Sequence, residues 1–180
     1  ISQVLSDNFD VDVKAEIDAK RLNRTYGLIG AEQHLMRYPG DTMAGHLKHN
    51  DAANKYVYSS GMAPGRGAWG YFSSSLAAFD QKSVEREKWY IAVQTFLAPD
   101  YNKRLGDYRD FFKFRKMILV NPTTGQAVVC DIGDAGPGQS TGKHLGGSPE
   151  VMQALGLHTG PRKGAVLYFF VDDPNDTIPL

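Results

Sequence analysis

The spacing of hydrophobic and polar residues changes partway along the chain, from a helical pattern to short strand-like segments. Within residues 10–26, Val13 and Ile17 belong to a loose apolar stripe that predicts a helix. The periodicity then fades between Gly27 and Ser60, where Gly, Asn, Asp and His are frequent. We expect this segment to be a long arm that covers the rest of the fold, and not a separate domain.

Several later segments are rich in β-branched and aromatic residues and predict strands. They are Lys88–Phe96, Lys116–Pro122, Gln126–Ile132 and Gly164–Val171. The last segment is apolar almost throughout, which is typical of a strand covered on both faces. Because the link between the second and third segments contains Pro122 and Gly125, we expect these two strands to form a hairpin.

Short helices are predicted between these strands. Asp80–Lys88 has the composition of a short charged helix, and Asp100–Phe114 alternates charged with aromatic residues. The best delimited helix starts at Ser148, a good N-cap, followed by Pro149 at the first helical position. Gly156 can end it in the left-handed conformation. A helix of roughly two turns needs a packing partner to persist, so we expect it to lie against the strands.

The overall composition excludes several classes of protein. Lys+Arg and Asp+Glu both number 20, so the formal net charge is zero and attraction to nucleic acid is not expected. No apolar run reaches the roughly 18 residues that span a bilayer. Cys130, the single cysteine, excludes an intramolecular disulfide and is expected to be buried in its apolar run. The chain begins at Ile1 without Met, so we expect it to be processed or trimmed, which leaves secretion open.

Two motifs resemble those of a known barrel family. Gly133–Pro137 ("GDAGP") matches an Asn-Asp-Arg-Gly-Pro turn, and the pair Gly142–Lys143 matches a Gly-Arg pair. A capped helix that ends in Leu155–Gly156 follows. Upstream, Gly67–Phe72 ("GAWGYF") is similar to the Gly-Ala-Cys-Gly-Tyr-Gly motif of expansins and barwin-like proteins, with Trp69 in place of Cys. In order and spacing, these motifs resemble the double-psi β-barrel of the rare lipoprotein A and expansin group.

The resemblance covers roughly Ser59 to Asp172 and implies a mainly β fold, a six-stranded double-psi β-barrel with short helices. Residues 1–58 are then an N-terminal helix and covering arm, residues 59–172 the barrel domain, and residues 173–180 a C-terminal tail. It further implies an extracellular or cell-envelope protein, similar to uncharacterised bacterial envelope proteins, that engages a polysaccharide such as peptidoglycan in a barrel groove. A lytic transglycosylase-like enzyme is the catalytic form of this hypothesis. The alternative is a non-catalytic binding or structural module whose arm docks on another protein.

Asp134 is the first candidate for a catalytic acid, because acids at the mouth of the barrel groove act on glycans in the resembled group. The alternative is a carboxylate that hydrogen-bonds its own turn. His144 is a candidate for assisting acid–base chemistry or for a plain hydrogen bond, and Lys143 for holding the substrate. One position departs from the resembled enzymes, which carry an Asp before the helix where this chain has Gly146. The two-carboxylate arrangement of glycoside hydrolysis is therefore incomplete.

Aromatic residues beside the predicted strands are candidates for stacking against sugar rings. Trp69, Tyr71 and Tyr90 lie in or next to these strands. Each of them can equally be part of the core, where aromatic side chains commonly pack.

The arm contains a second group of candidate residues, Glu32, His34, Asp41, His46 and His49. His34 and Asp41 have the His-x6-Asp spacing of zinc-dependent peptidoglycan peptidases, which makes such a peptidase a remote alternative. The Gly expected between them and a downstream His-x-His are missing, so we favour a solvated loop and predict no metal ligand. The glycine-rich run before Lys143 does not complete a P-loop, and no cofactor is predicted.

Overall fold

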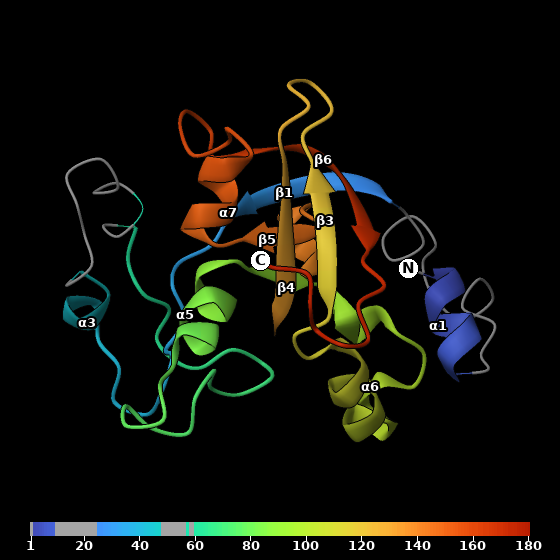
Figure 1. Ribbon diagram of the computed structural model, residues 1–180. Helices are drawn as coiled ribbons and strands as arrows, with labels where there is room; N and C mark the ends of the chain where they lie inside the picture. The colour runs from blue at the N-terminus through green and yellow to red at the C-terminus, as the bar shows by residue number, and fades with distance from the viewer. Residues whose placement is uncertain (1, 10–24, 48–56, 58–59) are drawn as a thin grey trace.

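The computed structural model describes residues 2–9, 25–47, 57 and 60–180, and it shows a closed six-stranded β-barrel surrounded by short helices (Figure 1). Around the barrel the strands follow the order β1-β5-β2-β4-β3-β6. Their bounds are β1 (Tyr26–Ala31), β2 (Tyr90–Val93), β3 (Lys116–Val120), β4 (Ala127–Ala135), β5 (Leu145–Gly147) and β6 (Lys163–Phe170). The mainly β barrel expected from the sequence is confirmed, and so is the β3–β4 hairpin.

Short helices flank the barrel, with α5 and α7 on one side of it and α1 on the other (Figure 1). Their bounds are α1 (Ser2–Phe9), α3 (Met43–Leu47), α5 (Gln81–Lys88), α6 (Leu105–Phe112) and α7 (Pro149–Ala154). The helices predicted near residues 80–88, 100–114 and 148–156 are confirmed. Most of the helix predicted over residues 10–26 lies outside the described residues.

The first strand of the barrel comes from the segment that the sequence analysis assigns to the arm. β1 pairs in parallel with β5 and antiparallel with β6, so the barrel draws on residues before Ser59. The glycines of β1 explain why its sequence did not predict a strand. A Cβ at Gly27 would lie 2.9 Å from the His144 ring, and a Cβ at Gly30 would lie 2.5 Å from the Lys143 side chain. Such close approaches favour glycine, which interrupts the apolar pattern by which strands are predicted.

β5 is a buried strand of three residues within a run that looked like a glycine-rich loop. It pairs with β1 on one side and β2 on the other, and so closes the barrel between them. A Cβ at Gly147 would lie 3.0 Å from Ile29 and from Met152. The small residues of β5 therefore allow α7 and the neighbouring strand to approach closely.

An apolar core fills the barrel and continues beneath the helices. Side chains that are fully buried include Leu5, Ile29, Ile91, Tyr108, Phe112, Met117, Leu119, Cys130, Ile132, Val151, Leu155 and Val166. Burial raises the pKa of the Cys130 thiol well above its usual value, as expected for an inert core cysteine. Among the helices that the structure describes, none has the length and apolarity needed to cross a membrane.

Candidate functional site

Four paired positions form one row across neighbouring strands on the outer face of the barrel. Gly30 pairs with Gly146, Gly146 with Ala92, and Ala92 with Asp134. The residues that precede the first three in β1, β5 and β2 belong to the barrel core. Because side chains alternate along a strand, the row faces outward. We call Gly30, Gly146, Ala92 and Asp134 the outer row.

Two charged side chains lie over the glycines of the outer row. A Cβ on Gly146 would overlap the Oε1 atom of Glu32 and lie 2.5 Å from its Cγ atom. A Cβ on Gly30 would lie 2.7 Å from the Nζ atom of Lys143. Since the two glycines are paired, the carboxylate of Glu32 and the ammonium of Lys143 occupy neighbouring places on this face. Glycine at both positions makes room for them.

Both acids at the outer row have raised pKa values. Burial raises the pKa of Glu32, the charge of Lys143 lowers it, and the charge of Asp134 raises it, with a net increase. Burial also raises the pKa of Asp134, against backbone hydrogen bonds that lower it. Half-buried acids with raised pKa values are typical of functional sites.

The Asp134 carboxylate connects the two sequence motifs. Its Oδ1 atom accepts a hydrogen bond from Ala135 N at 2.8 Å and from Ala68 N at 2.6 Å. Ala68 belongs to the "GAWGYF" motif, so Asp134 holds that turn against β4. The Oδ1 atom of Asp134 is therefore hydrogen-bonded to backbone amides, which is close to the alternative given above for this residue. Glu32 is therefore the stronger candidate for an acid that exchanges a proton with a substrate.

An open cavity of about 310 Å³ adjoins Glu32 and Lys143. Its lining combines one acid with three basic side chains and comprises Ala31, Glu32, Gln33, Ser60, Lys143, Pro161, Arg162 and Lys163. This excess of basic groups suits a polar ligand that carries anionic groups.

The other predicted site residues differ in their contacts and in how exposed they are. The Nδ1 atom of His144 accepts a hydrogen bond from Leu28 N at 3.0 Å, so this ring helps to fix β1. Trp69 and Tyr90 are 6% and 1% exposed, so their ring faces are packed in the core and do not lie open to a sugar. Tyr71 is half-buried and keeps part of its surface accessible.

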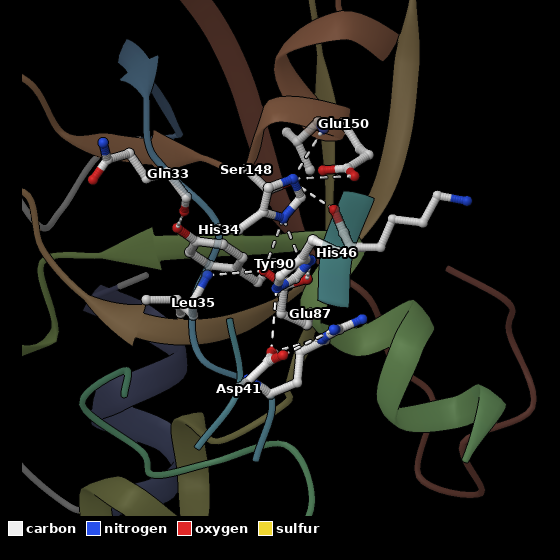
Figure 2. Close-up of polar contacts among 12 residues, drawn as sticks. Gln33, His34, Leu35, Asp41, His46, Glu87, Tyr90, Ser148 and Glu150 are labelled. Carbon is white, nitrogen blue, oxygen red and sulfur yellow. Dashed lines mark hydrogen bonds and ion pairs between the residues drawn. The ribbon is translucent and has the colours of Figure 1, made fainter. Parts of the chain in front are cut away.

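A second group of reactive side chains is buried where the arm meets α5 and α7 (Figure 2). His34 Nδ1 lies 3.0 Å from Glu87 Oε1, and His46 Nδ1 lies 3.7 Å from Glu87 Oε2. The centroids of the two imidazole rings are 4.5 Å apart. These side chains are at most 3% exposed. The interpretation as a solvated loop is therefore wrong for His34, Asp41 and His46, whereas His49 lies outside the described residues.

Two further carboxylates flank the histidines. Asp41 Oδ2 lies 3.3 Å from His46 Nε2, and Glu150 Oε1 lies 3.6 Å from His34 Nε2. Arg37 binds Asp41 through two hydrogen bonds, Nε to Oδ2 at 2.7 Å and Nη2 to Oδ1 at 2.9 Å. We call His34, His46, Glu87, Asp41 and Glu150 the histidine–carboxylate cluster.

Burial and neighbouring charges shift the pKa values in this cluster. Burial lowers the pKa of His46 to about 4 and raises that of Glu150 to about 7. Burial also acts to lower the pKa of His34, but its hydrogen bond to Glu87 and the charge of Glu87 produce a net increase. For Asp41 the bonds from Arg37 outweigh burial and lower the pKa to about 2. At neutral pH His46 is thus uncharged and Asp41 is ionised.

Sequence reasoning grouped Glu32 with the arm histidines and not with the outer row, and it missed Glu87 and Glu150 as neighbours of those histidines. Glu87 lies in a helix whose charged composition is typical of a solvent-exposed face. Glu150 has a sufficient local explanation at the first turn of α7, where the helix dipole favours an acid. The histidine pattern of the arm was the one available signal, and its spacing does not reveal which acids approach it.

The chain was also compared with known proteins. No family model matches it, and no curated protein is significantly similar to it in sequence.

Proposed function

We propose that this protein binds a peptidoglycan-like polysaccharide over the outer row and cleaves it with the carboxyl group of Glu32. The position of Glu32 over Gly146 is the observation that carries this proposal. The glycan-cleaving members of the resembled group have an Asp at the place of Gly146. Here the segment that follows β1 delivers a carboxylate to the same place from another strand.

The arrangement of the strands supports the double-psi interpretation of the barrel. Two pairs, β1–β5 and β2–β4, are parallel within a closed sheet whose other pairs are antiparallel. Parallel pairs need connections that cross the barrel, and such crossings characterise the resembled fold. An extracellular or cell-envelope location belongs to the same proposal, because that is where peptidoglycan is found.

A single carboxyl group suffices for the chemistry. In its protonated form Glu32 donates its proton to the glycosidic oxygen as the bond to the anomeric carbon breaks. The resulting carboxylate accepts the proton of the attacking hydroxyl group, from water or from the sugar itself, and the acid is restored. Atoms and charges balance over this cycle, and no second catalytic carboxylate is required.

The neighbours of Glu32 have supporting roles in this proposal. Asp134 disfavours a second negative charge nearby and thus favours the protonated acid. Lys143 and the basic residues of the adjoining cavity bind anionic groups of the polymer, such as the carboxylates of peptide stems. The Gln94 side chain donates hydrogen bonds to Pro137 O at 2.8 Å and Lys143 O at 3.1 Å, which fixes the loop that carries Lys143.

The test measures soluble fragments released from purified peptidoglycan sacculi by the wild type, Glu32→Gln and Asp110→Asn. Gln retains the shape of Glu but cannot donate an acidic proton, so Glu32→Gln should release about 10²–10⁴-fold fewer fragments. It should still bind sacculi in a pull-down. Asp110 is exposed on α6 and serves as the matched control with wild-type activity.

Three outcomes contradict the proposal in different ways. Full activity of Glu32→Gln removes Glu32 from the chemistry. Binding without fragment release by the wild type leaves a non-catalytic glycan-binding module. Absence of both binding and release refutes the polysaccharide proposal and favours a module that docks on another protein.

A further inference from the structure

The three central side chains of the histidine–carboxylate cluster have the spacing of metal ligands. Both imidazoles direct Nδ1 at the same carboxylate, at 3.0 Å for His34 and 3.7 Å for His46. One ligand atom from each of His34, His46 and Glu87 can be chosen so that all lie within 4.8 Å of one another. Ligand atoms held about 2.0–2.1 Å from a tetrahedral ion are about 3.3 Å apart. Small side-chain movements would therefore place all three around one ion.

The opposite nitrogen of each histidine also has a carboxylate beside it. His46 Nε2 lies 3.3 Å from Asp41, and His34 Nε2 lies 3.6 Å from Glu150. In metal sites, a ligating histidine usually donates its second N–H to a carboxylate or carbonyl, which fixes the tautomer and the ring orientation. Here a carboxylate oxygen lies beside the second nitrogen of each histidine, close enough to accept such a bond after a small movement of the side chains. Arg37 fixes Asp41 in turn through its paired hydrogen bonds.

The cluster gathers three buried carboxyl groups. Glu87, Asp41 and Glu150 are 2–6% exposed, and the buried guanidinium of Arg37 pairs with Asp41. Buried charges require compensation, and a divalent cation at Glu87 provides two positive charges. The Oε2 atom of Glu150 is buried and has no hydrogen-bond partner within the described structure. A bound ion with its water would supply one.

A route from solvent to the cluster exists. An open cavity of about 240 Å³ is lined by His46, Glu87 and Glu150 together with residues of α5. Three protein ligands leave at least one position of a tetrahedral ion open for water or a substrate. An ion can therefore enter from this side and keep a coordination site that faces the cavity.

We propose that His34, His46 and Glu87 bind one divalent transition-metal ion of the Zn²⁺ type. Asp41 and Glu150 orient the two imidazoles, and the ion joins arm residues 34–46 to α5. Borderline ions of this type suit two imidazole nitrogens and one carboxylate, whereas Mg²⁺ and Ca²⁺ favour all-oxygen sites. The site differs from the His-x6-Asp pattern, since Asp41 contacts a ligand and is not one itself. It shares no residue with the outer row.

The test uses the full, tag-free chain after removal of metal by a chelator. Titration with Co²⁺ should produce the visible absorption of a low-symmetry cobalt site, and Zn²⁺ should bind with one ion per chain and displace the cobalt. Zn²⁺ should also raise the thermal midpoint, since it binds the folded state. X-ray absorption of the zinc form should show two imidazole ligands.

Variants assign the ligands. His46→Gln and Glu87→Gln should each lose the cobalt spectrum and the zinc-dependent rise in midpoint, whereas His158→Gln, outside the cluster, should retain both. Asp41→Asn should weaken zinc binding about 10–100-fold, as expected for an orienting carboxylate. Circular dichroism of each variant establishes that it is folded.

The inference is overturned if the wild type gives neither a cobalt spectrum nor a zinc-dependent shift, and the cluster is then a buried hydrogen-bond network. It is also overturned if folded His46→Gln and Glu87→Gln bind zinc as the wild type does. These measurements need no polysaccharide. Their failure therefore leaves the proposal for Glu32 intact, and failure of the sacculus assay leaves the metal site intact.

Discussion

Gly146 provides the space that Glu32 occupies, and a single methyl group at this position tests that packing. In Gly146→Ala the new Cβ would overlap Glu32 Oε1 and lie 2.5 Å from Cγ, so the Glu32 side chain must move. Overpacking of this kind costs about 1–3 kcal/mol. Replacing Gly by Ala where the backbone allows it returns about 0.4–1 kcal/mol, because the unfolded chain loses freedom. We expect Gly146→Ala to be about 1 kcal/mol less stable than the wild type.

The packing explanation makes a sharper prediction in the absence of Glu32. In a Glu32→Ala background nothing occupies the place of the new methyl group, so Gly146→Ala should be neutral or slightly stabilising. The coupling energy between the two positions should then be about 2 kcal/mol. At distant, independent sites the stability changes of two substitutions add to within about 0.3–0.5 kcal/mol. The same displacement should also reduce fragment release by Gly146→Ala, although this variant retains every carboxylate.

The assay is urea unfolding of the wild type, both single variants and the double variant, followed by the fluorescence of Trp69 and Trp89. Equal m values across the four proteins establish that the unfolding transitions are comparable. A coupling energy below about 0.5 kcal/mol would refute the reasoning, because Glu32 would then not lie against Gly146.

Two further predictions concern stability. Ser148 Oγ accepts a hydrogen bond from Val151 N at 3.2 Å and donates one to Lys88 O at 2.7 Å. Ser148→Ala therefore loses an N-cap worth about 1 kcal/mol and removes the donor to the part-buried Lys88 carbonyl, at about 1–3 kcal/mol. Thermal unfolding should show a midpoint lower by about 4–16 °C, and an unchanged midpoint, equal to that of the exposed control Ser140→Ala, would contradict this. Asp131 is fully buried, its carboxylate oxygens have no hydrogen-bond partner in the described structure, and burial raises its pKa well above the usual value. Because its native pKa is raised, ionisation of Asp131 lowers the stability of the folded state above the unfolded pKa of about 4. Asp131→Asn should therefore increase the free energy of unfolding at pH 7. This gain should diminish as the pH falls towards 4. Urea unfolding at both pH values measures this, and a loss of stability at pH 7 would show that the carboxylate is needed.

Elements with local signals were determined by the sequence itself. The cap formed by Ser148 and Pro149 defines the start of α7, and the link with Pro122 and Gly125 predicts the β3–β4 hairpin. Caps, turns and apolar periodicity act between residues that are a few positions apart, so the sequence displays them directly. The burial of Cys130 was predictable from its apolar run, and the mainly β barrel was predicted from the resemblance of two motifs to a known family.

The candidate sites are only partly predictable in this way. Asp134 and Lys143 were identified because they lie in a motif. Glu32 was grouped with the arm histidines, and its place over Gly146 depends on the parallel pairing of β1 with β5. β1 itself was missed, because the glycines that admit the neighbouring side chains also interrupt its apolar pattern.

The approach of Glu87 and Glu150 to the arm histidines was decided by the tertiary structure. His34 and Glu87 are separated by 53 positions, and each has a sufficient local explanation as a polar residue of a loop or of a charged helix. They meet because the arm folds over α5 and α7 and excludes water from between them. Burial is what turns these ordinary side chains into a coupled group, since charges interact strongly only where solvent no longer screens them.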